Sequence, residues 1–134
     1  MQNDNSKSIP FNKFNLTVIN FQHNSDKLIS LKGTISVNKN LVFKDEVIIK
    51  PGTQFLLEKG VSVIFLNTVT AIGTEENPII FKKKDINDFS SNWGSIILQG
   101  INTKNSKFKH VIIDGGSGAE IDQYIYTSMF SLHD

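Results

Sequence analysis

The sequence predicts an all-β protein, and among all-β folds it favours a β-solenoid, in which the chain winds through stacked coils. Three observations carry this prediction. Short runs of β-branched and aromatic residues recur along the chain, and each is followed by Gly, Asn, Asp or Lys. No sustained helical spacing of apolar residues is present after residue 30. In addition, part of the pattern repeats at an interval in the twenties, a length typical of one solenoid coil.

The expected strands are short and lie between turn residues, at 34–37, 41–43, 47–49, 54–57, 61–66, 69–72, 78–81, 95–98, 111–113 and 126–130. Two other all-β folds, the sandwich and the closed barrel, are expected to show tight hairpins. No Asn-Gly or Asp-Gly pair joins two closely spaced strands here. The nearest case is Asp114-Gly115-Gly116, and the segment 117–122 after it makes a poor returning strand. The lack of hairpin signals therefore favours the solenoid, with the other two folds kept as alternatives.

The clearest internal repeat aligns 43–49 with 65–71, at an offset of 22 residues. The turn residues between the runs fit the corners of a coil. We expect Gly52 and Gly73 to supply the positive φ that tight corners need. Proline is expected at turn or strand-entry positions, where the backbone donates no ladder hydrogen bond.

Four phrases follow one another along the chain, at 47–53 (VIIKPGT), 69–81 (VTAIGTEENPIIF), 93–98 (WGSIIL) and 108–114 (FKHVIID). Their order resembles the opening coils of bacterial right-handed parallel β-helix proteins of the pectin-lyase-like group. The resemblance implies about four to five right-handed coils, stacked through parallel strands. The chain departs from that pattern at Ser95, where a second Gly is common.

We expect two parts, a polar N-terminal tail and cap over residues 1–30 and parallel β-helix coils over 31–134. A first coil presents an edge of unpaired backbone groups, which needs a cover. Apolar residues between 10 and 30 suit that role: Phe11, Phe14, Leu16, Val18, Ile19 and Phe21. The sequence shows no matching cap before Asp134. We therefore expect either that the natural protein continues or that the last edge pairs with another chain.

Charge and composition exclude several function classes. The chain has 14 basic and 13 acidic residues and a formal net charge of +1, which gives no reason to expect nucleic acid as a partner. The absence of cysteine excludes disulfides, thiolate zinc sites and a cysteine nucleophile. No apolar stretch has the length of a signal-peptide core or of a membrane span. From the resemblance we expect an extracellular or cell-envelope parent protein, with a cytoplasmic one as the alternative.

Two histidines are the first candidates for a surface site. His110 and His133 lie 23 residues apart, and Asp114 and Asp134 are close to them in sequence. If the coil register matched, the two imidazoles would stack on one face as a metal pair or an acid/base element. Unrelated surface histidines are the simpler interpretation, and we favour it. The alternation over 108–113 leaves the face of His110 open.

The other candidates are basic or aromatic. Lys82, Lys83 and Lys84 begin a loop that reaches Asn92. They would attract an anionic polysaccharide, although such a run more often keeps a strand edge soluble. Trp93 would stack on a sugar ring or pack at a coil corner, and we favour packing.

We expect no catalytic, cofactor-binding or metal-binding residue in this chain, because the acid clusters of polysaccharide hydrolases and the calcium ligands of lyases are not recognisable. The first hypothesis is a structural or carbohydrate-recognising β-helix module of a larger bacterial protein. One alternative is the N-terminal portion of a polysaccharide lyase, epimerase or glycoside hydrolase with catalytic residues beyond residue 134. Another is a self-associating, adhesin-like segment that uses its open C-terminal coil edge. Acidic clusters on successive coils would favour the enzyme, and Asn or Ser/Thr ladders would favour the scaffold.

Overall fold

The computed structural model describes residues 18–22, 27–121, 124–126 and 129–133, and within them the protein is all-β. The only helix among these residues is the short 3-10 helix η2 (Ile101–Thr103). The strands are β1 (Val18–Gln22), β2 (Leu28–Leu31), β3 (Thr34–Val37), β4 (Leu41–Phe43), β5 (Glu46–Ile49), β6 (Gln54–Leu57), β7 (Val63–Phe65), β8 (Val69–Ile72), β9 (Ile79–Lys83), β10 (Ile96–Gln99), β11 (Lys107–Lys109), β12 (Val111–Ile113), β13 (Ala119–Ile121), β14 (Tyr124–Tyr126) and β15 (Phe130–His133).

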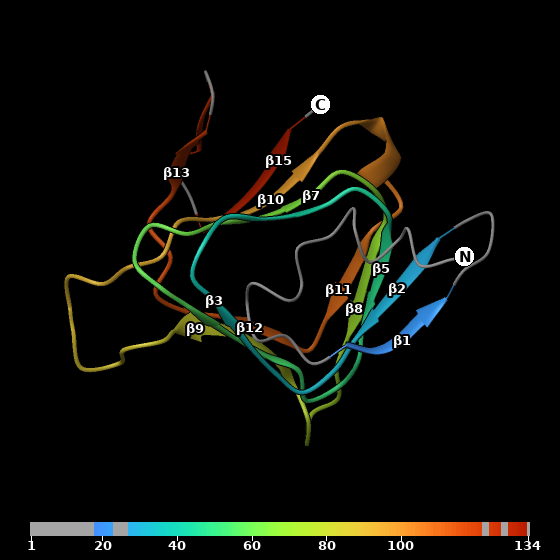
Figure 1. Cartoon of the computed structure of the whole chain (residues 1–134), viewed down its shortest axis with the longest axis horizontal. Coiled ribbons are helices and arrows are strands. Elements are labelled where there is room, and N and C mark those ends of the chain that lie inside the picture. The colour runs from blue at the N-terminus through green and yellow to red at the C-terminus, as the bar shows by residue number, and fades with distance from the viewer. Residues whose placement is uncertain (1–17, 23–26, 122–123, 127–128, 134) are drawn as a thin grey trace.

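The chain visits three sheets in turn, and Figure 1 shows them on three sides of a common interior. One sheet has the order β1-β2-β5-β8-β11, the second β12-β9-β6-β3 and the third β15-β10-β7-β4. Each pass through the three sheets adds one strand to each of them. All pairings from β2 onward in these sheets are parallel. The arrangement is that of a parallel β-helix, which confirms the predicted all-β, parallel stacked-coil class.

The internal repeat found in the sequence is a structural register. Phe43 lies beside Phe65 in the β4–β7 ladder, and Val47 lies beside Val69 in the β5–β8 ladder. Later passes keep the ladders but have longer excursions between strands. Ile79 lies beside Val111, and Ile96 lies beside Phe130. A fixed sequence period therefore holds only where the corners have equal lengths.

Inward-pointing side chains form continuous apolar columns between the sheets. The strands β3, β4, β5 and β6 alternate buried residues with more exposed ones, as expected when one face of a strand is in the core. Register places like residues on each other. The rings of Phe43 and Phe65 stack at 5.3 Å between centroids, and those of Phe55 and Phe81 stack at 4.3 Å. All four rings are fully buried.

A buried polar ladder runs along one corner of the stack. The Asn40 side-chain oxygen accepts a hydrogen bond from the Ser62 backbone N–H at 2.8 Å. The Ser62 hydroxyl in turn accepts one from the Ser95 N–H at 3.0 Å. Gly94 has no room for a side chain, because an added Cβ would collide with the Ser62 Oγ. This ladder satisfies backbone donors that the turn at each corner would otherwise leave buried and unpaired.

The two corner glycines have different reasons for being glycine. Gly52 has φ of +82°, as predicted, and Thr53 after it is buried with its hydroxyl donating to the Lys50 carbonyl at 2.7 Å. The same prediction is wrong for Gly73, whose φ does not lie in the left-handed region. An added Cβ at Gly73 would lie 2.7 Å from the His110 carbonyl oxygen. Close approach of the next coil therefore requires this glycine.

Two further features differ from the sequence-based expectations. The segment 108–114 is not one strand, because His110 has φ of +52° and turns the chain between β11 and β12. An antiparallel pair, β13 with β14, lies outside the three sheets and was not expected. At the other end, β1 pairs antiparallel with β2, the first parallel strand. This pairing covers that strand edge, but Phe11, Phe14 and Leu16 of the expected cap lie outside the described residues.

The aromatic columns lead to a stability prediction. Phe81→Ala should lower the free energy of unfolding by about 3–5 kcal/mol, because it removes a fully buried ring and leaves a cavity beside Phe55. Phe89→Ala is the matched control, since that ring is 89% exposed and its loss should cost less than about 0.5 kcal/mol. Urea denaturation followed by the fluorescence of Trp93 measures both. Equal losses in the two variants would contradict a core built on these columns.

Candidate functional site

The corner between β10 and β11 is the most elaborate described corner that carries surface cations. Gly100 opens it with φ of +94°, and η2 follows. Thr103 is buried, and its hydroxyl donates to the Gly100 carbonyl at 2.7 Å. The Lys104 N–H donates to the Ile101 carbonyl at 3.3 Å. These bonds fix the backbone from which Lys104 extends.

Side chains also tie this corner to the previous coil. The Thr68 hydroxyl donates to the Asn102 carbonyl at 3.0 Å, and the Ser106 hydroxyl accepts from the Val69 N–H at 2.9 Å. Thr68 and Val69 open β8, so β11 and its preceding turn are held against β8. The corner is therefore a defined surface of the stack.

A groove lies on the outer side of this corner, and we call it the lysine groove. Its volume is about 510 Å³, and its lining residues are Thr70, Ile72, Lys104, Asn105, Ser106 and Lys107. Ile72 is 41% exposed, so an apolar surface is present between polar groups. The lining contains two lysines and no acidic residue.

The β8–β11 ladder sets the positions of the cations. Lys107 lies beside Thr70, and Lys109 lies beside Ile72, while Phe108 between the lysines packs against the core. Lys104, Lys107 and Lys109 are exposed, and the structure gives none of them an ion pair within the described residues. The outer face of β11 and its turn therefore carries three cations on one side of the stack.

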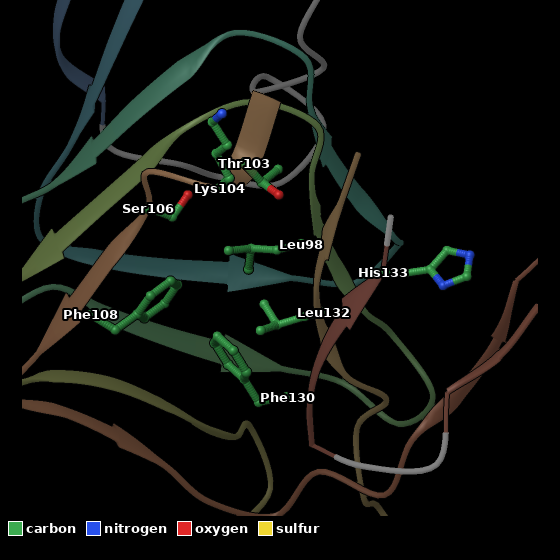
Figure 2. Close-up of a pocket in the computed structure, with 8 residues that line it drawn as sticks. All are labelled: Leu98, Thr103, Lys104, Ser106, Phe108, Phe130, Leu132 and His133. Carbon is green, nitrogen blue, oxygen red and sulfur yellow. The ribbon is translucent and has the colours of Figure 1, made fainter. Parts of the chain in front are cut away.

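A second hollow, which we call the terminal hollow, opens on the inner side of the same corner. Its volume is about 390 Å³, and Figure 2 shows Leu98, Phe108, Phe130 and Leu132 converging on it. The imidazole of His133 points away from these four side chains (Figure 2). The apolar columns of the interior reach the surface here, and Leu132 is 72% exposed although it pairs with the buried Leu98.

The two histidine candidates do not lie on one sheet. His110 is exposed at the turn between β11 and β12, and its carbonyl accepts from the Ile79 N–H at 3.0 Å. His133 ends β15 and lies beside Gln99 in the parallel ladder. The separation of 23 residues is not a coil repeat here, because the chain between them makes the excursion that contains β13 and β14. The stacked histidine pair is therefore not formed.

Their acidic neighbours form no site with them in the described structure. Asp114 is exposed and acts through its backbone, whose carbonyl accepts from the Trp93 Nε1 at 2.6 Å. Asp134 lies outside the described residues. Among the residues that the structure describes, no group of three or more His, Asp or Glu side chains is placed to hold a metal.

Trp93 is a core residue and not a surface one. Its side chain is fully buried, and its carbonyl accepts from the N–H and the hydroxyl of Ser117 at 2.9 and 3.0 Å. A buried indole cannot stack on a sugar ring. Trp93 instead fastens the corner after β9 to the turn after β12, as its bridge with Gly116 also indicates.

The three consecutive lysines separate in space from the lysine groove. Lys82 and Lys83 end β9, and the Lys83 Nζ donates to the Asp88 carbonyl at 3.1 Å. Lys84 forms an ion pair with Glu58 at 3.2 Å, with both side chains about half exposed. These lysines belong to a different corner, between the sheets of β9 and β10.

The sequence interpretation missed Lys104, Lys107 and Lys109. A signal was present, because Lys107-Phe108-Lys109 alternates in the way a half-buried strand does. The interpretation placed Phe108 and His110 on the same face, since nothing in the local pattern announced the turn at His110. The chemistry of the lysine groove is that of binding, because cations and hydroxyls line it without a carboxylate to act as acid or base.

The loop after β9 gives a prediction about acid titration. Hydrogen bonds from the Ser90 hydroxyl and N–H, at 2.6 and 2.8 Å, lower the pKa of Asp88 below its ordinary value of 3.8, and the nearby Lys59 and Lys83 act in the same direction. A lowered pKa means that this turn is supported above pH 3.8 and loses that support as the pH falls through the folded value. Ser90→Ala should raise the Asp88 pKa toward 3.8 in an NMR titration. An unchanged midpoint would contradict this assignment.

Comparison with protein-family models, curated proteins and solved structures finds no significant match for this chain. Within the described residues no helix is long and apolar enough to cross a membrane. The case for a function therefore depends on the geometry of the stack and of its surface grooves.

Proposed function

We propose that this chain is a non-catalytic recognition module of the right-handed parallel β-helix type, and that it binds an acidic polysaccharide along the lysine groove. One observation carries the proposal. Lys104, Lys107 and Lys109 line or flank a groove of about 510 Å³ on the outer face of β8 and β11, without an acidic residue in the lining. Right-handed winding is the sense expected for parallel crossover connections.

The groove combines the groups that a uronic acid polymer needs. Lys107 and Lys109 are alternate residues of β11, so their Cα atoms lie about 7 Å apart along the strand. Two such ammonium groups suit a chain with carboxylates at regular intervals. Ile72 and Thr70 offer an apolar surface and a hydroxyl between the cations, which suits the mixed apolar and polar faces of a sugar ring.

The lining argues for a polysaccharide over a nucleic acid. Single-stranded nucleic acids bind through aromatic side chains on which bases stack. No aromatic side chain lines the lysine groove. The net charge of +1 also gives no broad positive field for a duplex.

The lining also favours binding without cleavage. Hydrolysis of a glycosidic bond uses a pair of carboxyl groups, and uronate lyases use acidic calcium ligands with a base. Neither arrangement is present among the described residues around the groove. The polar ladder of Asn40, Ser62 and Ser95 supports the scaffold interpretation, because these polar groups are consumed in holding the coils together.

Binding of polygalacturonate, measured by calorimetry at low salt, tests the proposal. The variant Lys104→Gln/Lys107→Gln/Lys109→Gln should bind roughly tenfold more weakly, because each exposed charge pair contributes at most about 1 kcal/mol. Lys39→Gln, at an exposed turn before β4, is the control and should bind like the wild type. Binding that is insensitive to salt, or equal in the triple variant, would reject the groove as the site.

Self-association is a second candidate function, and the terminal hollow is the observation that favours it. The apolar columns end there on exposed or half-buried side chains, and the edges of β11, β12 and β15 have no further strand beside them within the described residues. A second β-rich segment would continue the ladders and bury Leu132.

Sedimentation velocity over a range of concentrations tests self-association. We expect a mass that rises with concentration for the wild type. Leu132→Asp should keep the chain monomeric, because it places a charge where the apolar columns would meet a partner. Ile112→Asp, an exposed outward position on β12, is the control and should associate as the wild type does. A wild-type chain that stays monomeric at all concentrations would remove this candidate.

A further inference from the structure

The loop between β9 and β10, residues 84–95, presents the most exposed large apolar side chains among the described residues. Phe89 is 89% exposed and Ile86 is 74% exposed. Figure 1 shows this loop, in yellow, extending away from the three sheets on the side opposite β5, β8 and β11. It thus lies far from the lysine groove, so the proposed polysaccharide site does not account for it.

The backbone of this loop is held in shape by its own polar groups. The Asp85 carboxylate accepts from the Asn87 N–H at 3.1 Å, and Asp88 accepts from both the N–H and the hydroxyl of Ser90. The buried Ser91 hydroxyl donates to the Asp88 carbonyl at 2.7 Å. Ile86 and Phe89 are therefore displayed from a defined turn in which polar side chains point back into the loop.

The charges around the loop differ in whether they are already paired. Glu58 is bound to Lys84, and Asp85 and Asp88 accept hydrogen bonds from the loop itself. Lys59 and Lys82 have no ion pair within the part of the chain that the structure describes. The Lys83 Nζ lies 5.8 Å from the centre of the Phe89 ring. The base of the loop is thus cationic toward its surroundings, and its tip is apolar.

We propose that this loop docks the protein on an anionic lipid bilayer. Ile86 and Phe89 enter the boundary between headgroups and acyl chains, while Lys59, Lys82 and Lys83 contact the headgroup phosphates. An apolar tip above a ring of lysines is the arrangement by which peripheral segments bind membrane surfaces. The internal hydrogen bonds of Asp85 and Asp88 reduce the repulsion that their carboxylates would otherwise add.

The observations favour a bilayer over a protein partner for this loop. A protein hot spot is expected to have a surrounding contact surface that excludes water. Around Ile86 and Phe89, the loop residues from Lys84 to Ser90 are all exposed. The hollow at the base of the loop, about 290 Å³, is lined by charged residues on both sides. Two isolated apolar side chains on a protruding turn suit shallow insertion into a soft interface.

Sedimentation with phosphatidylcholine vesicles, with and without phosphatidylserine, tests the proposal on the full chain. The wild type should sediment with the anionic vesicles and dissociate at high salt. Ile86→Ser/Phe89→Ser should bind about tenfold more weakly or less, because two apolar side chains no longer leave water. Lys59→Gln/Lys82→Gln should lose the preference for phosphatidylserine while keeping the loop turns.

A matched control and a folding check make the outcome decisive. Ile101→Ser removes an exposed apolar side chain of another corner, 68% exposed, and should leave vesicle binding unchanged. The fluorescence of the buried Trp93 reports whether each variant is folded. Failure of the wild type to sediment with anionic vesicles would overturn the proposal, as would equal binding by the folded Ile86→Ser/Phe89→Ser variant. Capture of a protein through Phe89 without vesicle binding would also overturn it, in favour of a protein partner.

Discussion

Register between parallel coils is the constraint on which the rest of this structure depends. Each inward side chain lies on the equivalent side chain of the next coil, so the choice at one level limits the choice at the next. Phe43 stacks on Phe65 and Phe55 stacks on Phe81 for this reason. The same rule governs the buried polar groups of Asn40, Ser62 and Ser95, because a donor buried at one level must find its acceptor at the adjacent level.

This constraint acts on the strands and leaves the corners free. The ladders stay in register although the segment after β9 and the one after β12 are much longer than the corners of earlier coils. Surface function can therefore differ from corner to corner without disturbing the core. The lysine groove arises at the β10–β11 corner, and the exposed loop with Ile86 and Phe89 arises at the β9–β10 corner. Because these corners face opposite sides of the stack, one module offers two separate surfaces (Figure 1).

Much of the fold could be predicted because local pattern and global packing agree in the early coils. The expected runs at 34–37, 41–43, 54–57 and 69–72 coincide with β3, β4, β6 and β8. Prediction failed where one residue changed the parity of the alternation. The positive φ of His110 lets Phe108 and then Val111 both pack against the core, although strict alternation places them on opposite faces. The lysines of β11 were missed as a site for the same reason.

The sequence by itself determined the all-β class, the short strand length and the positions where the chain turns, because these depend on residues that are neighbours along the chain. The tertiary structure alone decided which glycine needs a positive φ and which needs open space. It also decided that Trp93 is buried and that Lys104 and Lys107 meet beside Ile72. These features depend on contacts between coils whose separation changes with the length of every corner. A ladder position is therefore known only after the excursions have been counted out in three dimensions.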